Sequence, residues 1–183
     1  MIKVKVRFQK IGGYEMRTIN RIIDTCMAAL SGIAALALGF LLIGICYSTF
    51  SRFIFNKPIT SLVEYSTYSL IYITFLSAPQ ILKARGHIYI DMITNMLSKK
   101  GNGILGIVVN LVGAVISAVV FYYGSLVVKD NYLFNVKVMD SMGTPQFMLT
   151  MVIPIGMFFV TIQFIRNLYA DYLQLKEANT TKK

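Results

Sequence analysis

Histidine, cysteine and acidic residues are scarce in this sequence. It has 183 residues, among them one histidine, two cysteines and eight aspartates and glutamates together. A bis-histidine haem site needs two histidines, and a zinc or di-metal site needs several converging ligands. Cys26 and Cys46 would lie about 30 Å apart on one helix that rises about 1.5 Å per residue, too far for a disulfide. We therefore expect no metal site, no cofactor and no enzymatic activity.

Charged residues are also few, and four long runs contain none. They make up 14% of the chain, whereas hydrophobic residues make up 56% and the mean hydropathy is +0.63. The uncharged runs are 25–51, 65–82, 101–128 and 141–165. Each reaches the roughly 18–20 residues that cross about 30 Å of hydrocarbon. The sequence predicts an all-α integral membrane protein with four transmembrane helices. These are expected over about 22–50, 61–82, 103–128 and 145–168, which together form one membrane domain, 22–168.

The basic residues predict the orientation in the membrane. The net charge is +10, which in a soluble protein would suggest nucleic-acid binding. Here the charge is sorted by segment, so we expect no nucleic acid as a partner. Three segments are rich in basic residues: Lys3, Lys5, Arg7, Lys10, Arg17 and Arg21; Lys83, Arg85, Lys99 and Lys100; Arg166, Lys176, Lys182 and Lys183. The other two loops hold only Arg52 and Lys57, and Lys129 and Lys137. The positive-inside rule places the segment 1–21, the middle loop and the tail 169–183 in the cytoplasm.

The segment 88–98 is too polar to span and predicts a short surface helix. Its apolar residues share one helical face: Tyr89, Met92, Ile93, Met96 and Leu97. Polar residues, including Asp91, lie on the opposite face. This pattern is typical of an amphipathic helix on the membrane surface, here the cytoplasmic one.

Two of the predicted spans carry a stripe of small residues. The first stripe is Ala28, Gly32, Ala35 and Gly39, and the second is Gly106, Asn110, Gly113 and Ser117. Small residues allow membrane helices to approach closely. The favoured interpretation is packing within a four-helix bundle, and the alternative is docking against the helices of a partner.

Two clusters of charged residues lie at the predicted membrane boundaries. Arg52, Lys57 and Glu64 lie near the outer surface. They form either a rim ion pair, worth about 0–1 kcal/mol, or a docking site for a soluble partner. Lys83, Arg85, His87 and Asp91 lie near the inner surface, where contacts with lipid headgroups are the simplest interpretation.

The region 61–91 resembles a known family. Glu64, the segment ITFLSA at 73–78 and the segment KARGHIYID at 83–91 resemble the small permease subunit of tripartite ATP-independent periplasmic (TRAP) transporters. Arg52 matches an arginine that this family shows in the first outer loop. The length and the four-span plan are similar over about 16–175.

The resemblance implies a system of three proteins in the bacterial inner membrane and periplasm. A periplasmic substrate-binding protein captures an organic anion of the sialic acid or C4-dicarboxylate class, and a large permease moves it with sodium. The small subunit anchors the permease among the membrane lipids. On this view Arg52, Lys57 and Glu64 are candidates for docking the binding protein. The candidates for contact with the permease or lipid are Arg85, His87, Asp91, Gly106, Asn110 and Gly113. The alternative functions are a free-standing tetraspan assembly factor and a small channel.

Overall fold

The computed structural model describes residues 14–55, 59–85 and 99–180. Within these ranges the chain is almost entirely helical, which confirms the predicted all-α fold. The helices are α2 (Tyr14–Phe55), α3 (Thr60–Arg85), α5 (Lys99–Leu133), α6 (Gln146–Thr150) and α7 (Val152–Thr180). The surface helix predicted over 88–98 lies outside the described residues.

The long helices extend beyond the predicted spans. The first span was expected over 22–50, whereas α2 runs over 42 residues from Tyr14 to Phe55. At 1.5 Å per residue this is about 63 Å, roughly twice the hydrocarbon thickness of a bilayer. The uncharged run predicts only the apolar part of the helix, because the charged segments on either side of it are helical as well.

Three helical stretches are long and apolar enough to cross a membrane: Asn20–Phe55 in α2, Ile104–Leu133 in α5 and Gln146–Leu173, which covers α6 and most of α7. The remaining predicted span, 61–82, corresponds to α3. It does not reach that hydropathy because α3 contains seven serines and threonines and three tyrosines. Five of its hydroxyl groups donate hydrogen bonds to carbonyl oxygens one turn earlier in the same helix: Ser66, Thr67, Ser69, Thr74 and Ser77. The helix therefore satisfies these groups internally, although its sequence scores as polar.

The helix predicted over 145–168 is divided in two. Pro145 directly precedes α6, and the helix breaks at Met151, between α6 and α7. Pro154 explains the break, because it has no N–H to donate to the carbonyl group of Thr150 and its ring crowds that carbonyl. The sequence predicts a bend at Pro154 and a kink at Pro79, because proline disturbs an α-helix at both places. The interruption near Pro154 is confirmed, whereas α3 continues as one helix through Pro79.

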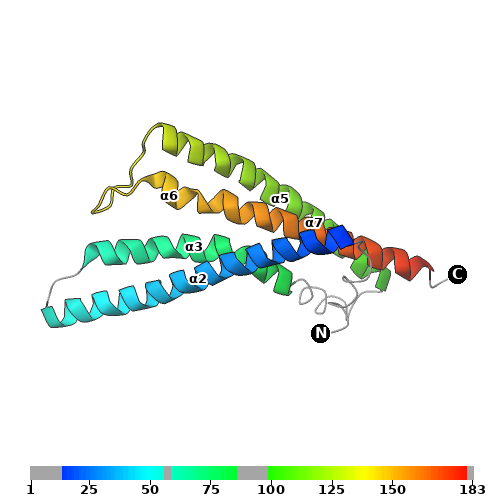
Figure 1. Ribbon diagram of the computed structural model, residues 1–183, viewed down its shortest axis with the longest axis horizontal. Coiled ribbons are helices and arrows are strands. Elements are labelled where there is room, and N and C mark those ends of the chain that lie inside the picture. The colour runs from blue at the N-terminus through cyan, green and yellow to red at the C-terminus, as the bar shows by residue number, and fades with distance from the viewer. Residues whose placement is uncertain (1–13, 56–58, 86–98, 181–183) are drawn as a thin grey trace.

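The helices pack in the order α2, α3, α7, α5, so that α2 and α5 lie on the outside (Figure 1). This arrangement is a row of helices, more open than the bundle expected from the sequence. At one end of the row lie the start of α2 and the end of α3, and we call it the basic end. At the other end the loop 134–145 joins α5 to α6, and we call it the hairpin end (Figure 1).

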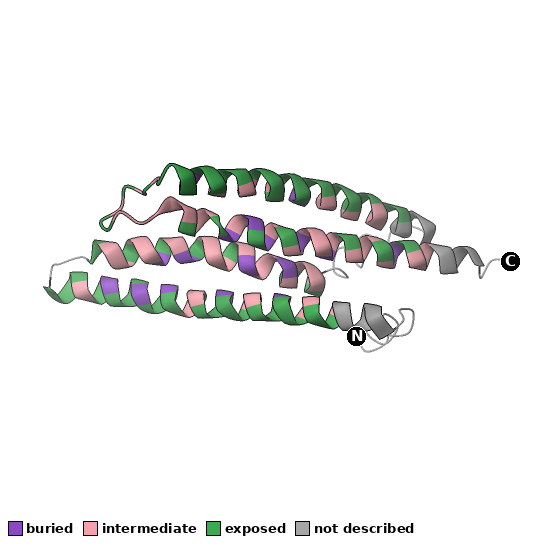
Figure 2. Cartoon of the chain, turned by 45° about the horizontal axis from the view of Figure 1, so that its top comes forward, coloured by how far each residue is buried: buried purple, intermediate pink, exposed green. Residues whose placement is uncertain are grey.

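The core of the row lies between α2, α3 and α7. Ala34, Leu76 and Val152 form a buried cluster that takes one residue from each of these helices. Toward α3, α2 buries Met27, Ala34, Leu41 and Ser48 at intervals of seven residues, and Gly44 between the last two. The outer helices expose most of their remaining surface, as Figure 2 shows in green. Exposed apolar side chains along α2 and α5 fit a protein that is covered by lipid or by another membrane protein.

A glycine sets the distance between α3 and α7. A Cβ atom added at Gly156 would overlap the backbone carbonyl group of Phe75. The two helices therefore touch backbone to backbone at this point, which is the close approach that small residues permit in membranes. Gly156 thus permits close contact between the two halves of the row, which are α2 with α3 and α5 with α7.

The small-residue stripe predicted on the first span points away from the other helices. A Cβ atom added at Gly32 or Gly39 would meet nothing within 4 Å. Ala28 and Ala35 are exposed as well. The prediction that this stripe packs inside the chain is therefore wrong, because α2 turns the neighbouring face, which carries Met27 and Ala34, toward α3.

Candidate functional site

The loop 134–145 at the hairpin end forms a short, ordered hairpin. The N–H of Val138 donates to the carbonyl oxygen of Thr144 at 2.9 Å, and the N–H of Gln146 donates to that of Val136 at 2.9 Å. Gly143 turns the chain with a φ of +65°, a left-handed conformation that favours glycine. We call this loop the 134–145 hairpin.

Glu64, at the start of α3, binds the tip of the 134–145 hairpin. One carboxylate oxygen accepts the backbone N–H of Ser141 at 3.1 Å, and the other accepts its hydroxyl group at 3.0 Å. The sequence suggested two partners for this carboxylate, a rim cation or a soluble protein. The structure instead places it against the chain's own loop, so both of its oxygens are already used.

Two tyrosines of α3 extend this contact. The hydroxyl group of Tyr65 lies 3.2 Å from the hydroxyl oxygen of Thr144, and that of Tyr68 donates to the carboxylate of Asp140 at 3.2 Å. Spacings of one and three residues put Glu64, Tyr65 and Tyr68 on adjoining faces of the first turns of α3. We call these three side chains together with Asp140, Ser141 and Thr144 the hairpin contact.

Asp140 is held as a carboxylate inside the hairpin contact. It accepts hydrogen bonds from both the hydroxyl group and the backbone N–H of Thr144, the latter at 2.9 Å. These bonds favour the ionised form and lower the pKa of the Asp140 carboxyl group to about 2. Asp140 was not among the residues predicted from the sequence. Only its place opposite the tyrosines of α3 marks it, and that place depends on how the helices pack.

The other two predicted docking residues stand apart from the hairpin contact. Arg52 lies exposed in the last turn of α2 and makes no ion pair within the described parts of the chain. Lys57 lies outside the described residues. The structure therefore does not bring Arg52 and Glu64 together, and docking by Arg52 and Lys57 stays a prediction.

A second polar cluster joins three helices at the basic end. The carboxylate of Asp24 on α2 lies 2.9 Å from the ammonium group of Lys83 on α3 and 2.7 Å from the guanidinium group of Arg166 on α7. We call these three residues the ion-pair cluster. From the sequence, Arg166 was expected only to orient the chain, Lys83 was expected to contact lipid headgroups as well, and Asp24 was not among the predicted site residues. An acidic residue at the edge of an uncharged run was the signal that could have found it.

Of the other candidates near the inner surface, the structure describes only Arg85. Arg85 ends α3, whereas His87 and Asp91 lie outside the described residues. Their contact with lipid or a permease stays a prediction.

The second small-residue stripe, on α5, faces α7. The amide of Asn110 donates to the buried carboxylate of Asp171 at 2.8 Å, and a Cβ atom at Gly106 would lie 2.6 Å from the same oxygen. A Cβ atom at Gly113 would lie 2.5 Å from the ring of Phe164. These three residues therefore pack inside the chain, the interpretation that the sequence favoured, and α7 occupies the face that a partner would need.

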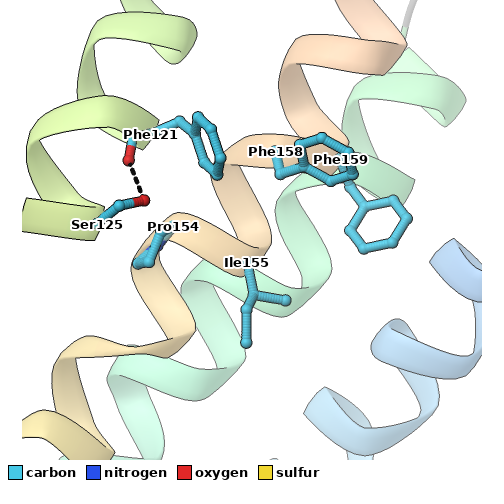
Figure 3. A pocket seen from close by; sticks show the side chains of 6 residues that line it. All are labelled: Phe121, Ser125, Pro154, Ile155, Phe158 and Phe159. Carbon is cyan, nitrogen blue, oxygen red and sulfur yellow. Dashed lines mark hydrogen bonds between the residues drawn. The ribbon is translucent and has the colours of Figure 1, made fainter. Parts of the chain in front are cut away.

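An open apolar groove lies between α5 and α7 (Figure 3). Its volume is about 490 Å³, and it is lined by Phe121, Ser125, Pro154, Ile155, Phe158 and Phe159. The one polar side chain, Ser125, donates its hydroxyl group to the carbonyl oxygen of Phe121 at 2.7 Å, as the dashed line shows. The groove thus offers hydrocarbon contact and no group that could bind an anion. Within the described residues, no three His, Cys, Asp or Glu side chains converge to hold a metal ion.

Comparison with known proteins identifies the family. Residues 41–174 match the family of tripartite ATP-independent periplasmic transporters, DctQ component. This range contains the hairpin contact, the groove and the α5–α7 contact, whereas Asp24 precedes it. No curated protein sequence matches the chain significantly. The family confirms the resemblance seen in the sequence and decides against a free-standing assembly factor or channel. The chain belongs to the DctQ family and is a small, multi-pass membrane subunit of a TRAP transporter, not an enzyme.

Proposed function

We propose that this chain is the fixed scaffold of a sodium-coupled TRAP transporter for an organic anion of the sialic acid or C4-dicarboxylate class. In this role it anchors the large permease in the bacterial inner membrane and helps to receive the periplasmic binding protein. The permease carries the sodium and substrate sites, and the small subunit holds it in place while it moves the substrate.

One observation carries this proposal: the spanning helices have no charged residue near mid-depth. Ion and substrate pathways in membranes normally use ionisable residues or broken helices at that depth. The break at Met151 lies instead near the hairpin end, one short helix after the 134–145 loop. Asp24, Lys83 and Arg166 lie at the basic end, where the one carboxylate offsets part of the charge of the two cations. A subunit without a site of its own is better suited to support a partner that has one.

We further propose that α3 is the fourth transmembrane helix and that the basic end faces the cytoplasm. In support, α3 lies between α2 and α7, two helices that are apolar enough to span. Arg21, Lys83 and Arg166 lie at one end of the row, in agreement with the positive-inside rule. The hairpin end, with Arg52 near it, then faces the periplasm.

Purification from cells that express all three proteins tests the proposal. We expect the chain to bring down a large permease in a one-to-one complex in mild detergent. Proteoliposomes with this complex should take up substrate only when sodium and the binding protein are both present. A reporter fused after Lys183 should read cytoplasmic. Uptake by this chain alone would contradict the scaffold role, and a periplasmic reporter signal would contradict the orientation.

A further inference from the structure

The 134–145 hairpin presents two methionines and a lysine at its surface. Met139 is fully exposed, and Met142 is 69% exposed. Lys137 is exposed too, and it forms no ion pair in the part of the chain that the structure describes. Methionine is a flexible, polarizable side chain that is frequent on surfaces that bind other proteins.

The polar side chains around these residues are already used by the hairpin contact. Both oxygens of Glu64 accept hydrogen bonds from Ser141, and both oxygens of Asp140 accept hydrogen bonds from Thr144. Tyr68 adds a further bond to Asp140. The sulfur of Met142 accepts a hydrogen bond from the hydroxyl group of Tyr65 at 3.4 Å, so this side chain is held against α3 on one side. What the hairpin offers to another molecule is therefore the whole side chain of Met139 and the exposed part of Met142, beside one ammonium group.

These exposed groups are held in a defined position. The hairpin has its own backbone hydrogen bonds and is fixed to α3 at its tip by Glu64. A loop that is ordered before binding loses less conformational entropy when it binds. The exposed side chains of the hairpin are thus preorganised for binding.

The charge of Asp140 indicates a protein, and not lipid, as the occupant. If Met139 and Met142 were inserted in hydrocarbon, the ionised carboxylate between them would have to follow, which is costly. On a soluble protein, an apolar recess can take the methionines while a carboxylate at its edge pairs with Lys137.

We infer that the 134–145 hairpin is the docking element for the soluble binding protein. Met139 and Met142 enter an apolar recess of that protein, and Lys137 faces one of its carboxylates. Glu64, Tyr65 and Tyr68 are positioning residues, which set the hairpin without touching the partner. This inference rests on the proposed function and names the surface that would receive the binding protein.

The contact residues are tested by uptake into proteoliposomes as a function of binding-protein concentration. For Met139→Ser with Met142→Ser, we expect the half-maximal concentration to rise about tenfold, as for the loss of a central contact. Lys137→Glu should raise it about threefold at low salt and less at 1 M salt, where the Debye length is about 3 Å. Lys129→Glu, the matched control on α5, should leave the curve unchanged. The maximal uptake should stay that of the wild type in all variants.

The positioning role of Glu64 is tested by two substitutions. Glu64→Ala removes both acceptors for Ser141, so we expect faster hydrogen exchange at the Ser141 amide and a higher half-maximal concentration. Glu64→Gln keeps one acceptor oxygen. We therefore expect its hydrogen-exchange rate at Ser141 and its half-maximal concentration to lie between those of the wild type and of Glu64→Ala. Slow exchange at Ser141 in Glu64→Ala would overturn the positioning role.

The results separate this inference from the proposed function. If the wild-type complex shows uptake that depends on the binding protein but the methionine variants leave the curve unmoved, the docking inference is wrong and the proposed function stands. If a probe on Met139→Cys, in a chain with Cys26→Ser and Cys46→Ser, is quenched by lipid-borne spin labels, the hairpin is a lipid contact and the inference is wrong. If the wild-type complex shows no such uptake at all, the proposed function itself fails.

Discussion

The two ends of the helix row are stabilised by different kinds of interaction: hydrogen bonds at the hairpin end and ion pairs at the basic end. At the hairpin end, a loop binds α3 through hydrogen bonds in which each carboxylate meets neutral donors. At the basic end, one carboxylate meets two cations from two other helices. Hydrogen bonds to neutral donors position a loop and leave its surface groups available for a partner. Ion pairs near a membrane instead lower the net charge where an unpaired charge would be costly. The difference suggests that one end serves recognition and the other serves anchorage.

The largest effect should come from separating α3 and α7 between the two ends. In Gly156→Ala, the new methyl group would overlap the backbone of Phe75, which cannot rotate away as a side chain could. We expect a loss of about 3 kcal/mol in the free energy of unfolding in mild detergent, the upper part of the range for overpacking. Gly124→Ala is the control, because its Cβ atom would lie at an ordinary 3.6 Å from Pro154. Equal thermal stability of the two variants would show that the contact at Gly156 does not stabilise the row, and that α3 and α7 are held together by the contacts at the hairpin end and the basic end.

A smaller effect should come from removing the charge at the basic end. Asp24→Asn keeps the shape of the side chain but leaves Lys83 and Arg166 without a counter-charge. Since these groups are partly exposed, we expect a loss of about 1–2 kcal/mol in the free energy of unfolding. The loss should shrink at high salt, as for other partly exposed pairs. The comparison is Asp130→Asn, an exposed acidic residue at the other end, which should change stability by less than about 0.5 kcal/mol. If both variants lose the same amount, the ion-pair cluster has no special role.

The smallest effect should be the response of the hairpin end to acid. The pKa of Asp140 is lowered from 3.8 to about 2. A lowered pKa stabilises the folded form fully above the unfolded value, and this stabilisation is lost as the pH falls through the folded value. The Thr144 amide should therefore keep its protection from hydrogen exchange down to about pH 4 and lose it between about pH 4 and pH 2. Asp140→Asn should abolish this step. A wild-type chain that loses the protection well above pH 4 would contradict the assignment.

Much of the fold follows from local sequence patterns. Runs without charged residues predicted every long helix, because hydrocarbon admits only segments whose backbone is hydrogen-bonded internally. The break near Pro154 was also predictable, since proline lacks the N–H that an α-helix requires. The short motifs in 61–91 led to the family that the match over 41–174 confirms.

The partners of single residues were less predictable. Two stripes of small residues look alike in the sequence, yet Gly113 packs on Phe164 and Gly32 meets nothing within 4 Å. Glu64 was recognised as a special residue, but its partner, Ser141, lies 77 positions away. A helical repeat tells which residues share a face, and it does not tell which element covers that face.

The sequence by itself determined that this chain is a helical membrane protein of the DctQ type, because span length, charge distribution and the family motif are local properties. Only the tertiary structure decided that the helices form a row, that Asp24 joins three of them and that Glu64 holds the 134–145 hairpin. The physical reason is that these contacts join residues far apart in the chain, and their partners are chosen by the way whole helices pack against one another.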